Sequence, residues 1–136
     1  MRGHILLIDD DPDEWDIFNE ALQQVCESCK CTYADGALDG LNMLRYIRPD
    51  VIFLDINMSK VNGFECLQRI KQIDTFSVVP VIIYSNGIVD ETFNKAMKMG
   101  ANACIRKPTG IPDLVKILSH VVHSPEPLSA IGTRFI

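Results

Sequence analysis

Five short apolar runs alternate with amphipathic stretches along this chain, and this alternation constrains the fold more than any other feature. Strands that are buried on both faces read as continuous apolar runs. Strands that alternate with helices are typical of βα units, which build a parallel sheet. The runs cover residues 5–8, 31–34, 51–54, 79–84 and 103–105. We therefore predict an α/β domain with an open five-stranded parallel sheet and helices on both faces.

The stretches between the runs have the spacing of amphipathic helices. Asp11 and Pro12 suit the N-cap and first turn of the first helix, and Gly100 suits the C-terminal cap of the fourth. The expected apolar faces contain Trp15, Phe18, Leu22 and Val25, then Leu41, Leu44 and Ile47, then Phe64, Leu67 and Ile70, then Phe93, Ala96 and Met97, and finally Leu114, Ile117, Leu118, Val121 and Val122.

Length and charge limit the number of domains and the kinds of partner. With 136 residues, the chain suits one domain, which we place at residues 1–123, with an extended or docked tail at 124–136. The net charge of -5 argues against direct binding to nucleic acid. Only four apolar residues precede the acids near the N-terminus, so we predict neither a signal peptide nor a membrane span, and a cytoplasmic location.

Polar side chains follow four of the five predicted strands. Asp9 and Asp10 follow the first, Asp55 the third, Ser85 the fourth and Lys107 the fifth. In open parallel sheets, ligands bind at the edge where the strands end. A lone Asp after a strand is ordinarily a turn former or a helix cap, but three carboxylates brought together repel one another and call for a positive group.

A hard divalent cation meets that need, because Mg²⁺ binds a few carboxylates and keeps its other positions for water and phosphate oxygens. Lys107 can neutralise an incoming phosphoryl group, and Ser85 can hydrogen-bond one of its oxygens. This combination is suited to the attack of a carboxylate oxygen on phosphorus, which gives an acyl phosphate.

Four segments, ILLIDDDP, VIFLDINMSKVNG, VIIYSN and CIRKP, resemble in order and spacing the receiver domain of two-component response regulators. The resemblance covers about residues 3–123. It implies a flavodoxin-like (βα)5 three-layer sandwich with strand order 2-1-3-4-5.

The resemblance also implies a role for each site residue. Asp55 would accept the phosphoryl group, Ser85 would be the switch hydroxyl, and Lys107 would pair with the phosphate. The implied Mg²⁺ ligands are Asp9, acting mainly through a bound water, Asp10, Asp55 and the backbone carbonyl of Asn57.

Three further positions bear on the resemblance. Pro108 matches a proline that often follows a cis peptide bond in the family, and we expect a cis bond here. Cys104 stands where many members carry an aromatic switch residue, so signalling would use backbone shifts instead. Asn86 replaces a small residue and is placed to touch the phosphoryl group or its attacking water.

The function that we predict is a stand-alone phosphorylation switch of a two-component system or phosphorelay. A histidine kinase or histidine phosphotransfer protein would phosphorylate Asp55, and the surface around the fourth helix and fifth strand would then bind a target protein. The chain would be a phospho-acceptor with slow self-dephosphorylation rather than an enzyme. The sequence leaves open whether it forms a homodimer.

Two alternatives remain. A Mg²⁺-dependent aspartyl-phosphate phosphohydrolase usually has a second acid two residues after the nucleophile, where this chain has Asn57. A receiver-like binding module that works without phosphate would leave a costly cluster of like charges unused.

The five cysteines raise a separate question. Cys26 and Cys29 form a C-x-x-C motif, and Cys31 follows it. A thioredoxin-type redox motif opens a helix, whereas this one follows the end of a predicted helix, and no histidine stands at zinc-site spacing. We therefore favour free thiols or small buried side chains, with Cys31 facing inward from a strand.

Overall fold

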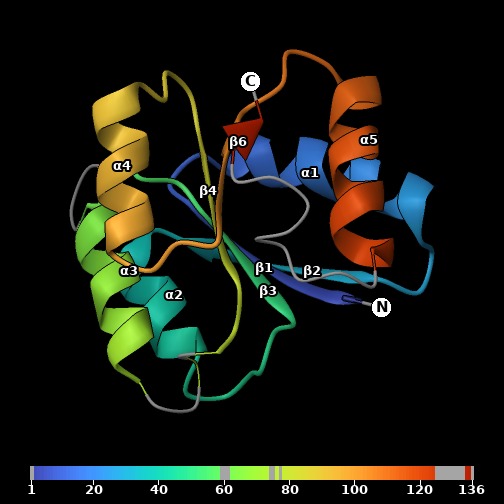
Figure 1. The fold of residues 1–136 in the computed structure, drawn as a ribbon. Helices are drawn as coiled ribbons and strands as arrows, with labels where there is room; N and C mark the ends of the chain where they lie inside the picture. The colour runs from blue at the N-terminus through green and yellow to red at the C-terminus, as the bar shows by residue number, and fades with distance from the viewer. Residues whose placement is uncertain (1, 59–61, 74–75, 77, 125–133, 136) are drawn as a thin grey trace.

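The computed structural model describes residues 2–58, 62–73, 76, 78–124 and 134–135, which form six strands and five helices (Figure 1). The strands are β1 (His4–Asp9), β2 (Lys30–Asp35), β3 (Val51–Leu54), β4 (Val81–Ser85), β5 (Ala103–Arg106) and β6 (Arg134–Phe135). The helices are α1 (Pro12–Val25), α2 (Ala37–Met43), α3 (Gly63–Gln72), α4 (Asp90–Lys98) and α5 (Ile111–His123).

The strands form one parallel sheet in the order β2-β1-β3-β4-β5-β6. The predicted order 2-1-3-4-5 is therefore confirmed. The structure adds β6, a two-residue strand that pairs with Cys104 and Ile105 on the outer edge of β5. Residues 125–133 and 136 of the predicted tail lie outside the described residues, so the extent of the tail stays a prediction.

The helices cover both faces of the sheet, as Figure 1 shows, with α2, α3 and α4 on one side and α1 and α5 on the other. Alternate residues of β1 point to opposite faces: Leu6 and Ile8 join the core under α2, α3 and α4, whereas Ile5 and Leu7 join the core under α1 and α5. Each of these four side chains is fully buried. Burial on both faces is the reason that the strands read as continuous apolar runs.

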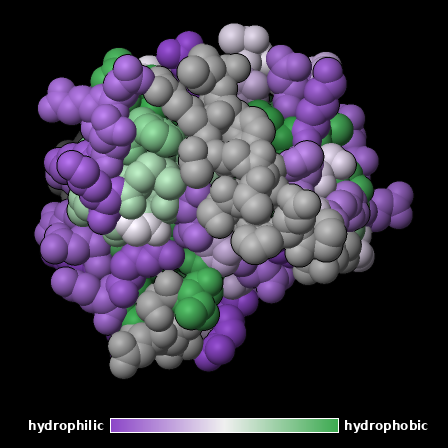
Figure 2. Space-filling model, in the orientation of Figure 1, coloured by the Kyte–Doolittle hydropathy of each residue, from purple (hydrophilic) through white to green (hydrophobic). Residues whose placement is uncertain are grey.

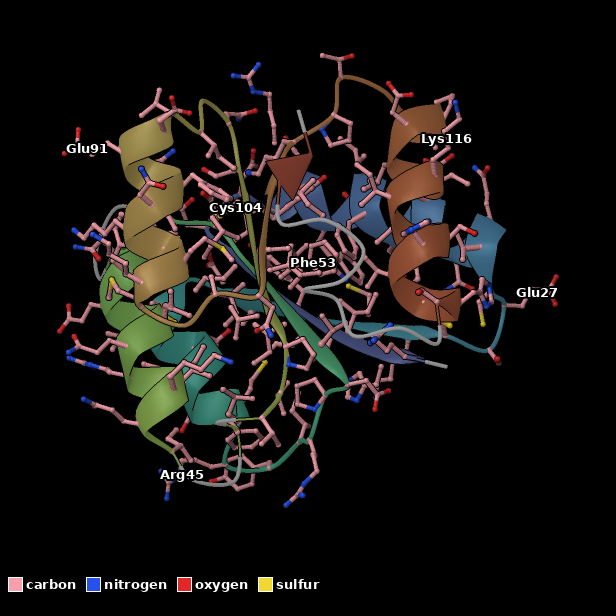
Figure 3. All side chains as sticks on the ribbon, in the orientation of Figure 1. Glu27, Arg45, Phe53, Glu91, Cys104 and Lys116 are labelled. Carbon is pink, nitrogen blue, oxygen red and sulfur yellow. The ribbon has the colours of Figure 1, made fainter. Side chains whose placement is uncertain are left out.

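Three aromatic rings fasten α1 to the middle of the sheet. Phe18 of α1 packs edge-to-face on Phe53 of β3 and on Tyr84 of β4, at ring-centroid distances of 5.0 and 5.7 Å. Phe53 and Tyr84 pack in the same way at 5.5 Å. Figure 3 shows Phe53 in the centre of the molecule, on the α1 and α5 side of the sheet. Such pairs contribute about 0.5–1.5 kcal/mol each beyond the burial of their area.

The helix ends follow the predicted capping signals in most places. The carboxylate of Asp11 caps α1 by accepting a hydrogen bond from the N–H of Asp13 at 3.0 Å, and Pro12 is the first helical residue. Gly100 follows α4 with a φ of 103°, a conformation that favours glycine. Helix α2 is shorter than its apolar spacing predicts: it ends at Met43, and Ile47 lies beyond it.

Hydrophilic residues cover the outer sides of α3 and α4 (Figure 2). In α4 only Ala96 is fully buried, while Phe93 and Met97 pack against the core partly exposed. Among the described residues, no helix combines the length and the apolar character that crossing a membrane requires.

Gly63, the first residue of α3, allows the chain that follows β3 to pack closely on itself. A Cβ atom there would lie 2.5 Å from the carbonyl oxygen of Asp55 and closer still to the Cα of Ile56. We therefore expect Gly63→Ala to lower the free energy of unfolding by about 1–3 kcal/mol in urea denaturation, because backbone atoms must move.

Gly110→Ala is the matched control for this substitution, since its Cβ would lie 3.6 Å from Pro112 Cδ, an ordinary contact. We expect the control to lose no more than about 0.5–1 kcal/mol, because Gly110 is the N-cap of α5 and alanine is a weaker cap. Equal stabilities for the two variants would contradict the steric argument.

Candidate functional site

Three carboxylates meet at the carboxyl edge of the sheet. Asp9 ends β1, Asp10 follows it, and Asp55 directly follows the neighbouring strand β3. One carboxylate oxygen from each lies within 4.8 Å of the others. Asp9 is fully buried and Asp55 is 5% exposed, whereas Asp10 is exposed to solvent. The structure therefore brings together the three acids that the sequence singled out.

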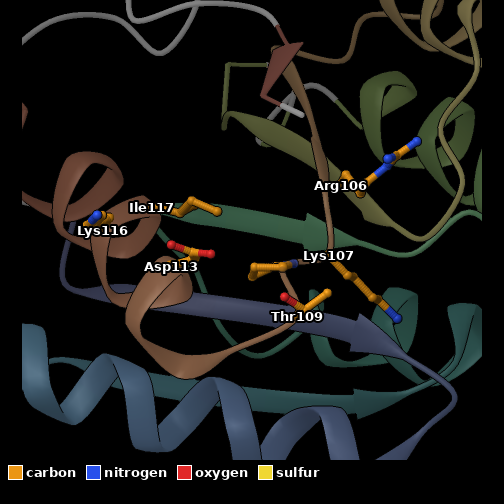
Figure 4. Close-up of a pocket in the computed structure, with 7 residues that line it drawn as sticks. Arg106, Lys107, Thr109, Asp113, Lys116 and Ile117 are labelled. Carbon is orange, nitrogen blue, oxygen red and sulfur yellow. The ribbon is translucent and has the colours of Figure 1, made fainter.

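Lys107 reaches this group from the end of β5, which is separated from β1 by two strands. Its Nζ donates to Asp9 Oδ2 at 2.8 Å and to Asp55 Oδ2 at 3.1 Å. Figure 4 shows the Lys107 side chain extending toward the end of β1, while Arg106 points the other way. The register of β4 and β5 positions the lysine, because its backbone N–H donates to the carbonyl of Ser85 at 3.1 Å.

Glu14 is a member of the site that sequence reasoning missed. Its carboxylate lies 3.7 Å from Lys107 Nζ and is 22% exposed. The signal for it was present in the sequence, because Glu14 stands in the first turn of the helix that follows β1. That turn begins at the edge of the sheet where the other acids gather.

The charges in this group perturb one another. Burial raises the pKa of Asp9 to about 6, although the hydrogen bonds from Lys107 and from the N–H of Asp11 oppose the rise. Burial would lower the pKa of Lys107, but its hydrogen bond with Asp9 and the charges of Asp9, Asp55 and Glu14 raise it to about 12. Lys107 therefore stays charged, and it does not fully offset the cost of ionising Asp9.

Asp55 accepts hydrogen bonds on both of its oxygens. Oδ1 accepts from the hydroxyl of Ser85 and from the backbone N–H of Asn57, each at 2.9 Å, and Oδ2 accepts from Lys107. Ser85, at the end of β4, is fully buried. These donors fix the orientation of the carboxylate.

The side chain of Asn57 has a contact that the sequence did not suggest. Its Nδ2 donates to Ser85 Oγ at 2.9 Å and to the carbonyl of Asn86 at 3.4 Å. The role of the backbone carbonyl of Asn57 as a metal ligand stays a prediction. The expected contact of Asn86 with a phosphoryl group also stays a prediction, and its side chain is exposed.

The expected cis bond before Pro108 is wrong, because the described residues contain no cis peptide bond. The two isomers of a bond before proline differ by only about 0.5–1 kcal/mol, so local sequence does not decide between them. Cys104 is fully buried on the α4 side of the sheet, where Figure 3 places it between β5 and α4.

The acids of this site suit a hard cation. Asp9, Asp10 and Asp55 present carboxylate oxygens close together, and such oxygens are the ligands that Mg²⁺ prefers. Lys107 offsets only part of the cost of ionising Asp9, and this is a second reason that a cation fits here. The residues present therefore fit the predicted metal.

Comparisons with known proteins indicate the family of this chain. A family model described as the response regulator receiver domain matches residues 5–119. The two-component response regulator ARR16 of Arabidopsis thaliana is 27% identical over 134 residues, with 88% of this chain and 80% of that protein covered. The sensor histidine kinase RcsC of Escherichia coli K12 is 29% identical over 112 residues, which is 82% of this chain but 11% of the kinase.

Solved structures of receiver domains have the same fold. The signal receiver domain of the DNA binding response regulator merR from Colwellia psychrerythraea superposes with a TM-score of 0.78 at 27% identity, covering 89% of this chain and 98% of that one. The chemotaxis response regulator CheY4 of Vibrio cholerae has a TM-score of 0.78 at 22% identity, with 89% and 99% covered. Together with the family match, these likenesses show that the chain belongs to the response regulator receiver domain family, the signalling modules of two-component systems.

Proposed function

We propose that this chain is a phosphorylation-dependent switch in which Asp55 accepts a phosphoryl group from a histidine kinase or a histidine phosphotransfer protein. The observation that supports this most is the set of hydrogen bonds on Asp55. Ser85 and Lys107, the two side chains suited to hold phosphoryl oxygens, both donate to this one carboxylate beside two further acids.

In the proposed transfer, a carboxylate oxygen of Asp55 forms a bond to phosphorus while the bond between phosphorus and the donor histidine nitrogen breaks. Lys107 and Ser85 exchange their bonds to Asp55 for bonds to the phosphoryl oxygens, and so stabilise the charge that the group brings. Asp9, Asp10 and Asp55 would hold Mg²⁺, which when bound supplies positive charge beside the transferring group.

The proposed readout is a shift of α4 and β5 that a target protein recognises. Ser85 ends β4, and only the loop of residues 86–89 separates it from α4. Movement of Ser85 toward a phosphoryl group would pull on that loop. Helix α4 can respond because Ala96 is its one fully buried residue and its other core contacts, from Phe93 and Met97, are partly exposed. Elements with little buried surface move at small cost in free energy. The cytoplasmic location stays a prediction.

The first test is the intact mass of the protein after incubation with acetyl phosphate and Mg²⁺. We expect one added phosphoryl group on the wild type and none on Asp55→Asn, because the amide is not a nucleophile for this reaction. A chelator should abolish the adduct. If Mg²⁺ binds but no adduct appears, release of inorganic phosphate would indicate a phosphohydrolase, and its absence would indicate a module that works without phosphate.

A second test concerns Asn57, whose side chain holds the Ser85 hydroxyl. One lost hydrogen bond corresponds to about 1 kcal/mol, so we expect Asn57→Ala to slow phosphorylation by acetyl phosphate about fivefold. The matched control is Asn42→Ala, because Asn42 is exposed near the end of α2 and has no place in the site. Equal phosphorylation rates for the two variants would show that the hydrogen bond from Asn57 to Ser85 does not position the hydroxyl for the reaction.

A third test concerns the cost of charge at Asp9. Folding raises its pKa from 3.8 to about 6, so the folded state binds the proton more tightly, and stability falls as the pH rises between these values. In EDTA at pH 7.5, we expect Asp9→Asn to raise the free energy of unfolding by on the order of 1 kcal/mol. The gain should disappear below about pH 4, where the wild type is protonated in both states.

The amide at position 9 keeps an oxygen for the N–H of Asp11, which limits other changes. Asp16→Asn, on the exposed side of α1, is the control and should have little effect at either pH. A less stable Asp9→Asn at pH 7.5 would mean that pairing with Lys107 outweighs the cost of burial.

A further inference from the structure

The C-x-x-C motif forms a tight turn far from the acidic site. Cys26 is the C-cap of α1, where its N–H donates to the carbonyl of Leu22 at 2.9 Å, and Cys29 directly precedes β2. The N–H of Cys29 donates to the carbonyl of Cys26 at 3.3 Å. This bond closes a turn over residues 26–29. In Figure 3, Glu27 of this turn points away from the molecule into solvent.

The turn holds the two cysteines at a separation that suits a disulfide. Cα atoms at the ends of a hydrogen-bonded turn lie less than about 7 Å apart, and disulfides join Cα atoms about 4.4–6.8 Å apart. The two thiols lie close enough for each to change the pKa of the other. Gln23 of α1 holds the far side of the turn by donating to the carbonyl of Cys29 at 3.3 Å. Little backbone movement is therefore needed to join the sulfurs.

The two thiols differ in access and acidity. Cys26 is partly exposed, and hydrogen bonds from Cys29 and Ser28, whose Oγ lies 3.3 Å from Sγ, lower its pKa. Cys29 is 4% exposed, and burial raises its pKa to about 11. Cys31 is also buried, and burial raises its pKa to about 12. Because thiolate character and access control oxidation, Cys26 is the thiol in this turn that reacts first.

We propose that Cys26 and Cys29 are a redox-sensitive pair that a peroxide converts into a reversible disulfide. The Cys26 thiolate attacks one peroxide oxygen, the O–O bond breaks, and a sulfenic acid and hydroxide form. The hydroxide takes up the proton that the Cys26 thiol released and leaves as water. The Cys29 sulfur then attacks the Cys26 sulfur, the S–O bond breaks, and a second water leaves. Overall, two thiols and hydrogen peroxide give one disulfide and two waters, and a dithiol reverses the change.

This pair is separate from the phosphorylation site. The Cys26 end of α1 is opposite the end that carries Asp11 and Glu14, and a helix of 14 residues is about 21 Å long. The position after a helix rules out the thioredoxin arrangement, in which the motif opens a helix, but a simple disulfide has no such requirement. The test below therefore does not depend on phosphotransfer.

Cleavage with trypsin separates the proposed pair from Cys31. Cys26 and Cys29 fall in one peptide, residues 3–30, and Cys31 falls in the next, residues 31–45. The folded protein is treated with hydrogen peroxide, remaining thiols are alkylated, and the peptides are weighed. We expect peptide 3–30 to lose two hydrogens, to escape alkylation, and to regain both thiols after treatment with dithiothreitol. Far-UV circular dichroism should show the same fold before and after oxidation.

Two variants and a control separate the roles of the thiols. Cys29→Ser should stop at the sulfenic acid, so that dimedone labels Cys26, and Cys26→Ser should form neither product in peptide 3–30. Cys31→Ala is the matched control and should form the same disulfide as the wild type. An unchanged peptide 3–30, a cross-link between peptides 3–30 and 31–45, or equal dimedone labelling of Cys26 and Cys31 would overturn the proposal.

Discussion

The electrostatic contact on which the site depends is the bridge from Lys107 to Asp9 and Asp55. Two buried carboxylates at neighbouring strand ends repel each other, and the ammonium between them reduces that repulsion at 2.8 and 3.1 Å. The lysine does not offset the whole cost of burying Asp9, since burial still raises the pKa of Asp9 to about 6. A bound cation would lower the remaining free-energy cost of ionising Asp9. Lys107, which two acids share, can move its hydrogen bonds to an incoming phosphoryl group.

The sheet makes this bridge possible. Strands β1 and β3 are neighbours, so Asp9 and Asp55 lie side by side, and β4 separates β3 from β5, so Lys107 must cross the end of the sheet. The cores on both faces hold these strands in register. On the far side of the molecule, the turn at the end of α1 is shaped by its own hydrogen bonds, and this is why its chemistry is independent of the site.

Much of this could be predicted from sequence, for identifiable physical reasons. Apolar runs marked the strands, and the polar residues after four of the five runs marked the edge where Asp9, Asp55, Ser85 and Lys107 meet. Glu14 was missed because an acid in a first helical turn is ordinarily read as a favourable partner of the helix dipole. The bond before Pro108 was predicted from resemblance alone, and the two isomers are too close in free energy for sequence to separate.

The amino-acid sequence by itself determined the alternation of strands and helices, the order of the polar strand ends and the family, because these depend on periodicity and on residue type along the chain. Only the tertiary structure decided which of these groups touch. The bonds from Asn57 Nδ2 to Ser85 Oγ and from Lys107 to two acids join residues 28 to 98 positions apart. Contacts of this kind depend on strand register and side-chain direction, which are set by packing on both faces of the sheet and not by local sequence.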